Sequence, residues 1–448
     1  MTEDRSVNLG RVPRSQTEYL AGKEGDVLDV VGVGYGPSNL ALAVALEEHN
    51  SSADSSESIR SVFLDRKSSF GWHQGMLIED ATMQVSFIKD LVTMRNPTSR
   101  FSFLAYLHAH DRLADFVNLK SFFPARAEFH AYLEWVAAQL GNSVLFGSEV
   151  LSMKPMGDQQ AIKVVFRQGM VQRTLLTRNV VLGIGITPSI PSGAELGPRV
   201  WHSSELLHRL ELLGESPKRI IVVGAGQSAA EVTEYLHRRF DGAEVMAVHR
   251  RYGYSVADDT PFVNGIFDPS AVDVFFGATK EVKDELLNYH RNTNYGVVDQ
   301  GLSEELYRRV YSERVSGKRR LYFFNATEIR NVDVNETEVR AEVTHLPSGE
   351  IRALTADILI YATGYASSDP LAILGDVAPY CKTEDAGRLQ VNRDHSIVVS
   401  GDLAGSIFLN GGSEHSHGLS STLLSNIGVR SGEILHSILV QQRDGIAG

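Results

Sequence analysis

Two stretches of the chain share one order of apolar and polar positions. Each has a short apolar run, then a turn rich in glycine, then a segment with the spacing of a buried helix. The first stretch (27–46) turns at Gly32-x-Gly34, and the second (219–231) turns at Gly224-x-Gly226. A strand, a tight turn and a helix in this order let the backbone approach a pyrophosphate that faces a helix N-terminus. The pattern therefore predicts two dinucleotide-binding units.

The residues that end the second strand of each unit differ in charge. Asp65 follows the apolar run 61–64 and suits the ribose hydroxyls of FAD, whereas Arg250 and Arg251 follow 243–248 and suit a 2′-phosphate. We therefore place FAD in the first unit and NADPH in the second. Spacing alone does not choose between the two arginines. The alternative is a pair of structural units without ligands, which the opposite charges disfavour.

The order of elements predicts an α/β fold with two Rossmann-like dinucleotide-binding domains and a smaller, mostly helical substrate-binding subdomain. Helical spacing is clear at 127–140, and the buried strand at 356–361 is interpreted as a return to the FAD domain. The expected parts are a flexible N-terminal arm (1–25), an FAD-binding domain in two parts (26–205 and 355–448), an NADPH-binding domain (206–257 and 315–354) and a helical insertion (258–314).

Composition narrows the class of protein. The 448 residues are 43% hydrophobic and 22% charged, as in soluble globular proteins, and the net charge of −12 argues against nucleic-acid binding. The sequence has no apolar run of membrane-spanning length and no apolar signal core, so we expect a cytoplasmic protein without membrane contact. The single Cys381 excludes an intrachain disulfide and the redox-active dithiol of disulfide reductases. His73, His415 and His417 lack partner ligands at metal spacing, so no metal site is predicted.

Two loops after the first unit carry candidate chemistry. Residues 70–77 and 83–91 mix aromatic, sulfur-containing and polar side chains without a period of 2 or 3.6, which suits loops packed against a planar ring. Lys89 lies inside an apolar part of the second loop, where a charge needs a partner. The alternative is a core strand with a solvated lysine.

These motifs together resemble the flavin-dependent N-hydroxylating monooxygenases of siderophore biosynthesis, most closely the L-ornithine N5-monooxygenases. The resemblance runs from about Asp29 to Gly432, and Pro37 at the third glycine position, with Gly36 one place early, is part of the family pattern. The segments that carry the resemblance are 31–37, 72–76, 83–91, 226–231, 292–295, 362–365 and 417–420.

The resemblance implies hydroxylation of the side-chain amine of L-ornithine by NADPH and molecular oxygen through a C4a-hydroperoxyflavin. Such chemistry needs a closed site, because water destroys the hydroperoxide. It also needs a neutral amine, and deprotonating a side-chain amine at pH 7 costs on the order of 4 kcal/mol. Burial beside the flavin supplies part of that shift.

The resemblance also implies roles for single residues. Lys89 pairs with the α-carboxylate of the substrate, and Asn264 and Asn294 bind its carboxylate and α-amine. Met83 and Gln84 lie against the flavin ring, and with Asn294 they form the expected catalytic set. Ser425 or Thr422 contacts the substrate amine. The expected cofactor-binding residues are Gly32, Gly34, Gly36, Pro37, Asp65, Trp72, His73, Gln84, Gln227, Ser228, Arg250, Thr363, Gly364, His417 and Leu419.

Three other functions are alternatives to this one. The same chemistry on L-lysine or a diamine such as putrescine is the first, although the three substrate-binding residues form a carboxylate and ammonium clamp that a diamine leaves unpaired. Segments 116–119 and 123–126 are also more similar to the ornithine branch than to the lysine branch. A sulfur- or carbonyl-oxidising flavin monooxygenase and a non-enzymatic dinucleotide sensor are the others. Because relatives often form homotetramers, a homotetramer is the expected assembly.

Overall fold

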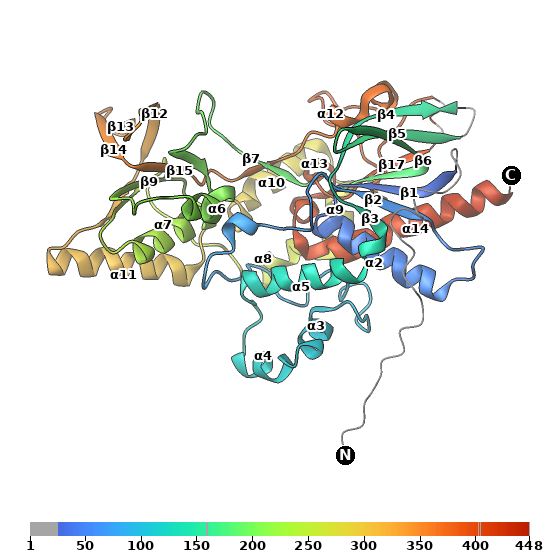
Figure 1. Cartoon of the computed structure of the whole chain (residues 1–448), viewed down its shortest axis with the longest axis horizontal. Helices are drawn as coiled ribbons and strands as arrows, with labels where there is room; N and C mark the ends of the chain where they lie inside the picture. The colour runs from blue at the N-terminus through green and yellow to red at the C-terminus, as the bar shows by residue number, and fades with distance from the viewer. Residues whose placement is uncertain (1–25, 158–159, 402, 404, 448) are drawn as a thin grey trace, which may run out of the picture.

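The computed structural model describes residues 26–157, 160–401, 403 and 405–447. Two sheets lie towards opposite ends of the long axis, with helices packed on each (Figure 1). This arrangement confirms the predicted α/β fold with two dinucleotide-binding units. The predicted arm at 1–25 lies outside the described residues.

The first sheet contains both parallel and antiparallel strands. β1 pairs in parallel with β2 and β6, and β17 adds in parallel to β6, while β5 and β4 continue the sheet as an antiparallel meander. Its strands, in spatial order, are β3 (Val144–Leu145), β2 (Ser61–Leu64), β1 (Val27–Val33), β6 (Val171–Leu182), β5 (Ala161–Gln168) and β4 (Ser148–Met156), with β17 (Ser406–Leu409) beside β6.

Helices cover one face of the first sheet. α2 (Pro37–Ser52) crosses from β1 towards β2, and α14 (Ile427–Ala447) packs along it. α5 (Arg126–Gln139) follows the predicted helical spacing and buries Phe129, Tyr132 and Leu133 against the same core. Short helices α3 (Phe103–Ala109) and α4 (Leu113–Leu119) project below α5 in Figure 1.

The second sheet is entirely parallel. Its glycine turn joins β9 (Arg219–Val223) to α7 (Gln227–Arg239), as the sequence predicts. The order of the sheet is β11 (Leu321–Phe324), β10 (Glu244–Val248), β9, β15 (Ile358–Tyr361) and β8 (Val200–His202). α7, α6 (Leu206–Glu211) and α11 (Gln300–Ser316) contribute to the core on one face, and the small sheet of β12 (Thr327–Val334), β13 (Val339–His345) and β14 (Ile351–Ala356) packs on the other.

Three expected assignments are wrong. The sequence predicts that β15 returns the chain to the first sheet, but it pairs with β9 and β8 of the second sheet. The predicted first domain includes β8, which lies in the second sheet. The predicted helical insertion includes most of α11, yet this helix packs on α7, where Arg309 bonds Glu234 at 2.8 Å. Apolar spacing predicts that an element is buried but not which neighbour buries it, and this explains all three errors.

Two connections join the sheets. β7 (Ile186–Pro188) and β16 (Tyr365–Ser367) pair antiparallel where the chain passes from one sheet to the other and back. Arg126 at the start of α5 also donates to both carboxylate oxygens of Glu231 in α7, at 2.7 and 2.9 Å, and both side chains are largely buried. A bidentate pair of this kind fixes the orientation of the two helices.

Three further helices lie between β10 and α11 in sequence, within the part of the chain that forms the second sheet. They are α8 (Pro261–Asn264), α9 (Pro269–Gly277) and α10 (Lys280–Asn294), with a short 3₁₀ turn at Gly265–Phe267. α9 contacts α13 (Glu414–His417), so this segment packs on the C-terminal part of the chain. The residues of the expected insertion are thus mostly helical, and the domain boundaries that the three corrections above do not touch stay predictions.

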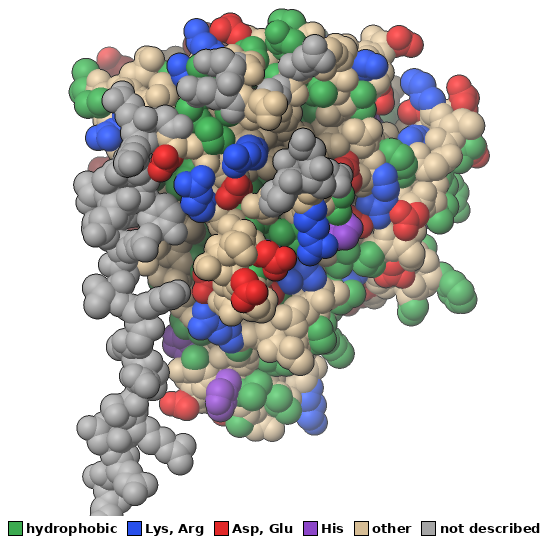
Figure 2. All heavy atoms as spheres, turned by 90° about the vertical axis from the view of Figure 1, so that its right-hand side faces the viewer, with side chains coloured by type: hydrophobic (Ala, Val, Ile, Leu, Met, Phe, Trp, Pro, Cys, Tyr) green, Lys and Arg blue, Asp and Glu red, His purple; other side chains and the backbone are tan. Residues whose placement is uncertain are grey.

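The surface shown in Figure 2, which is the right-hand side of Figure 1, carries interspersed acidic and basic side chains. No helix of the described residues has the length and apolar character needed to cross a membrane. In the same residues, no three His, Cys, Asp or Glu side chains are grouped so that they could hold a metal ion.

Candidate active site

The first glycine turn is shaped by a close backbone contact. Gly34 has φ +83°, and a Cβ there would lie 2.4 Å from the carbonyl oxygen of Gly183, so no side chain fits. In contrast, a Cβ on Gly36 would meet no atom within 4 Å, so this part of the turn faces open space. α2 starts at Pro37 without a side-chain cap, and its first N–H groups therefore have no side-chain acceptor. These features fit the diphosphate of a dinucleotide.

Asp65 anchors the same turn. Its Oδ2 accepts from the backbone N–H of Tyr35 at 2.7 Å, and its Oδ1 accepts from the N–H of Lys67 at 2.8 Å. The side chain is buried, and each carboxylate oxygen keeps a further lone pair for a ribose hydroxyl. The predicted ribose contact is compatible with this geometry and stays a prediction.

The second turn repeats the same constraint. Gly224 has φ +145°, and a Cβ there would lie 2.3 Å from the carbonyl oxygen of Ala362. Gln227 uses its side chain within the protein, since its Oε1 accepts from Asp299 N at 2.7 Å and its Nε2 donates to Glu231 at 3.0 Å. This amide therefore fixes the turn to α11 and α7.

A groove of about 1800 Å³ opens at the second turn. It brings together predicted residues from four distant segments, which are Gln227, Ser228, Arg250, Asn294, Thr363 and Gly364. The groove also contains residues that the sequence analysis did not select, among them Arg330, Glu328 and Glu414. Arg330 lies in β12, and its sequence position carries no signal beyond strand alternation.

Arg250 and Arg251, the two candidates for the phosphate contact, differ in the contacts that their side chains make within the protein. The Arg250 side chain is 75% exposed, and its Nε lies 3.3 Å from Glu328, a carboxylate that also binds Arg330 at 2.7 Å. Arg251 instead donates to the carbonyl oxygen of Gly296 at 2.6 Å and packs over that glycine. Arg250 is therefore the one that can turn towards a phosphate in the groove.

Lys89 has no anionic partner among the described residues. Its ammonium lies 6.0 Å from the centroid of the Phe267 ring, in the turn that follows Asn264. The neighbouring Asp90 is buried and accepts from the backbone N–H groups of Val92, Thr93 and Phe103 instead. The structure thus brings the Lys89 loop to the segment that carries Asn264.

The other predicted substrate residues are less close to each other. Asn264 donates to the carbonyl oxygen of Asp259 at 2.6 Å, which leaves its amide oxygen available. Asn294 ends α10 and lines the groove, whereas Lys89 is not among the residues that line it. Ser425 is buried in the 3₁₀ turn Leu424–Asn426, whereas Thr422 lines the groove. The geometry favours Thr422 over Ser425 as a groove residue.

Met83 and Gln84 differ in exposure. Met83 is buried in the first core, and its backbone N–H donates to Pro124 O at 2.9 Å. Gln84 is exposed, so its side chain can reach a ligand. Both assignments as catalytic residues stay predictions.

The Trp72 loop meets the linker between the sheets. His73 adopts φ 52°, and its ring lies edge-on to Trp72 at 4.6 Å and to Tyr365 at 6.0 Å. Burial and the nearby Arg126 lower the pKa of His73 to about 4, so the ring is neutral at pH 7. The Thr363 hydroxyl donates to the carbonyl oxygen of Ser189 at 2.5 Å. This bond joins the segment between β15 and β16 to the segment that follows β7.

Glu414 and Tyr295 form a polar pair that the sequence analysis did not assign. The Tyr295 hydroxyl lies 3.1 Å from Glu414 Oε2 and 3.2 Å from Thr422 Oγ1, and all three residues line the groove. Burial raises the pKa of Glu414 and, for the same reason, that of Tyr295 to about 12. Tyr295 belongs to segment 292–295, which carries the family resemblance, but nothing in the sequence indicates its partner.

His417 lines a small cavity that also contains Arg430, and it does not line the groove. Its ring stacks on His395 with centroids 4.2 Å apart, and its Nε2 lies 3.2 Å from the carbonyl oxygen of Arg393. Burial and the neighbouring His395 lower the pKa of His417 to about 3. Leu419, two residues further on, is buried. The structure itself does not assign either residue to a cofactor.

Two sheets, each with a glycine turn and a helix N-terminus, define the class of oxidoreductases with two dinucleotide-binding folds. Within that class, the chain belongs to the L-lysine 6-monooxygenase/L-ornithine 5-monooxygenase family, whose model matches residues 26–367. This confirms the family that the sequence motifs indicated.

Individual relatives are similar over most of their length. The L-ornithine N(5)-monooxygenase of Burkholderia cepacia is 41% identical over 405 residues, which covers 88% of this chain and 90% of the relative. A solved structure of the ornithine N-hydroxylase of Kutzneria sp. 744, with reduced FAD, NADP⁺ and L-ornithine, is 45% identical and has a TM-score of 0.89. The match covers 93% of this chain and 100% of that chain. The structure of the ornithine hydroxylase of Pseudomonas aeruginosa is 36% identical and has a TM-score of 0.86, and the match covers 92% of this chain and 99% of that chain.

The stacked histidines predict a pH dependence of stability. Because the unfolded chain binds a proton at His417 below pH 6.5 and the folded chain does not, stability is present above pH 6.5 and lost as the pH falls towards 3. Between about pH 6.5 and pH 4, we expect the wild type to lose on the order of 3 kcal/mol more of its free energy of unfolding than the His417→Gln variant loses. Urea unfolding of the apoprotein at several pH values measures this.

The exposed His108 is the matched control, since His108→Gln should leave the pH profile as it is in the wild type. Equal slopes for His417→Gln and the wild type would contradict the assignment.

Proposed function

We propose that this protein hydroxylates the side-chain amine of L-ornithine to N5-hydroxyornithine, with NADPH and molecular oxygen, for a hydroxamate siderophore or a related natural product. Family membership and the three ornithine-hydroxylating relatives support the reaction. The main support for an amino acid as the substrate, and not a diamine, is Lys89. This side chain is half-buried, and its ammonium has no carboxylate partner among the described residues.

An α-carboxylate supplies the charge that Lys89 lacks. A cation held in a partly apolar loop gains most from an anion, and an ammonium and a carboxylate form a strong charge-assisted hydrogen bond. Asn264, on the segment that faces Lys89, adds an amide oxygen that can accept from an α-ammonium. A diamine presents no carboxylate, so this loop favours an amino acid.

FAD fits the first turn and NADPH fits the second. The open side of Gly36 and the uncapped start of α2 suit the FAD diphosphate, and Arg250 suits the 2′-phosphate of NADPH. When bound, FAD supplies the activation of oxygen after reduction by NADPH. The chain's part is to hold both cofactors, to orient the amine and to exclude water.

Several side chains can perform that exclusion. Trp72, His73 and Tyr365 meet edge-to-face between the first loop and the linker, and His73 is neutral there. A neutral aromatic wall adds no charge and lowers the local dielectric, which disfavours the protonated form of a buried amine. The homotetramer and the cytoplasmic location stay predictions.

The reaction itself is the first test. With ornithine present, we expect NADPH oxidation and hydroxyornithine formation in near-equal amounts, because a closed site protects the activated oxygen. Product analysis against NADPH consumption measures the ratio. If lysine or putrescine yields more hydroxylated product per NADPH than ornithine does, the substrate assignment is wrong.

Lys89→Ala tests the carboxylate contact. Loss of one charge-assisted hydrogen bond should raise KM for ornithine about tenfold or more and leave KM for NADPH unchanged. Lys283→Ala is a matched control, because Lys283 also lies over phenylalanine rings, at 5.4 and 5.8 Å, but on α10. Equal effects of Lys89→Ala on both KM values would remove Lys89 from the substrate site.

Arg250→Ala tests the phosphate contact. It should narrow the preference for NADPH over NADH about tenfold, since NADH lacks the 2′-phosphate. Arg251→Ala is the comparison variant. It breaks the bond to Gly296 and should affect both cofactors alike. Steady-state kinetics with each cofactor measure the ratio, and an unchanged ratio in Arg250→Ala would move the contact elsewhere.

A further inference from the structure

Arg430 is a buried cation on α14 with only neutral hydrogen-bond partners. Its side chain is enclosed, and the whole residue is 3% exposed. Its Nε donates to Asn410 Oδ1 at 2.9 Å, one Nη donates to the carbonyl oxygen of Ser421 at 2.6 Å, and the other donates to Ser38 Oγ at 3.2 Å. Three of the five N–H donors of the guanidinium are thus engaged, and these neutral partners do not balance its charge.

No carboxylate of the described residues forms an ion pair with Arg430. Glu433, three positions further along α14, accepts instead from Arg393 at 2.8 Å and His395 at 3.0 Å. Burial lowers the pKa of Arg430 to about 10 although the charge of Glu433 acts in the opposite direction, and the group is still charged at pH 7. A buried charge without a counter-charge in direct contact is costly, and proteins usually pair such a group.

The hydrogen bonds of Arg430 lead to the first glycine turn. Ser38, which accepts from Arg430, lies in the first turn of α2. Asn410 donates to Ser38 O at 2.9 Å and to Asn39 Oδ1 at 3.0 Å, and Asn39 in turn donates to the carbonyl oxygen of Gly34 at 2.8 Å. The charge is therefore connected to the turn that fits a diphosphate.

We propose that Arg430 is a positioning residue for the dinucleotide of the first sheet, whose diphosphate adds negative charge to a guanidinium that has no ion pair among the described residues. The identity of the dinucleotide as FAD rests on the proposed function. Arg430 acts through Ser38 and Asn410 and through its field in a region of low dielectric. Binding of the dinucleotide is then coupled to the packing of α14 on α2.

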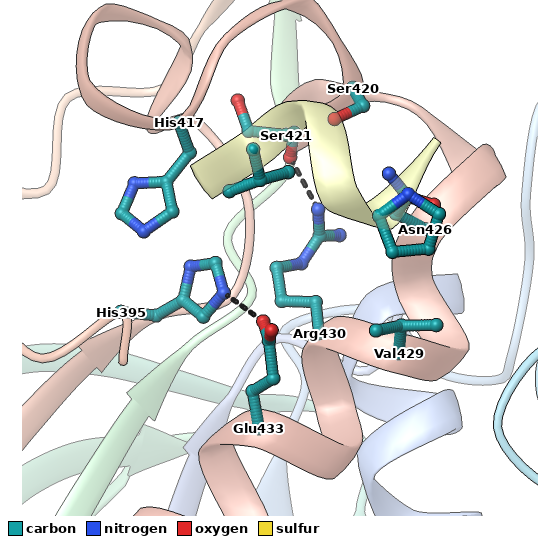
Figure 3. Close-up of a pocket in the computed structure, with 10 residues that line it drawn as sticks. His395, His417, Ser420, Ser421, Asn426, Val429, Arg430 and Glu433 are labelled. Atoms are coloured by element: carbon teal, nitrogen blue, oxygen red, sulfur yellow. Dashed lines mark hydrogen bonds and ion pairs between the residues drawn. The ribbon is translucent and has the colours of Figure 1, made fainter. Parts of the chain in front are cut away.

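A small cavity beside Arg430 offers a way to test the charge. It measures about 20 Å³, and Asn426 lines it with both amide atoms buried and without partners. In Figure 3 the Arg430 guanidinium lies between His395 and Asn426, with its bond to Ser421 dashed. Asn426→Asp therefore adds a negative charge at this cavity, keeps the side-chain shape and breaks no hydrogen bond.

The experiment compares flavin-free protein and its binding of FAD. Wild-type apoprotein should bind FAD, and failure at this step counts against the proposed function rather than against the role of Arg430. In Asn426→Asp, the local carboxylate replaces the diphosphate as counter-charge. We expect the melting temperature of the apoprotein to rise and FAD to bind about tenfold or more weakly. Quenching of FAD fluorescence gives the affinity.

Three arginine variants complete the test. Arg430→Gln, which removes the charge, should weaken FAD binding about tenfold or more, and Arg430→Lys, which keeps it, should bind FAD much more tightly than Arg430→Gln. Arg95→Gln is the matched control: Arg95 also packs against α14 but is already paired with Glu48 at 2.5 Å, so only stability should fall.

Unchanged FAD affinity in Asn426→Asp would overturn the proposal. So would equal losses in Arg430→Lys and Arg430→Gln, because a purely structural link depends on the shape of the guanidinium and not on its charge. If Arg430→Gln does not fold, Asn426→Asp still decides, since it retains Arg430 and its bonds.

Discussion

The close approach of backbone to backbone at two glycines determines how the rest of this molecule is built. At Gly34 and at Gly224, a Cβ would lie within 2.4 Å of a carbonyl oxygen on the neighbouring crossover. Because both positions also have positive φ, glycine alone fits without strain. Each turn can therefore end its strand tightly and start a helix at the carboxyl end of an interior strand, and the cofactor sites of the proposed function depend on these two turns.

The chain connects the two turns by crossing between the sheets twice. β7 and β16 pair where it crosses, Thr363 bonds Ser189 there, and Arg126 bonds Glu231 between α5 and α7. These contacts join segments far apart in sequence. They place the large groove next to the linker, so that Asn294, Thr363 and the second turn line one space. The proposed transfer between two cofactors needs such proximity.

Two cations without an ion-pair partner in the described part of the chain lie near the proposed ligand sites. Lys89 and Arg430 are cations without a carboxylate partner among the described residues, and they lie near the two places where the proposed function puts an anion. Arg250 differs, since it has a carboxylate partner in Glu328, which it shares with Arg330. A cation that the protein leaves unpaired costs stability, and an anionic ligand recovers that cost on binding. Ligand binding and folding are in this sense coupled.

The sequence by itself determined the two turns, the strands and helices around them, and the family. Glycine spacing, apolar runs and strand-end charges are local features, so they can be read without knowing the fold. Tertiary structure decided which sheet receives β8 and β15, and that α11 packs on α7, because apolar patterns carry no information on the partner. It also decided that Arg251 is committed to Gly296, that Tyr295 meets Glu414, and that Arg430 reaches Ser38. Those contacts join residues 45, 119 and 392 positions apart, and only the folded chain brings such residues together.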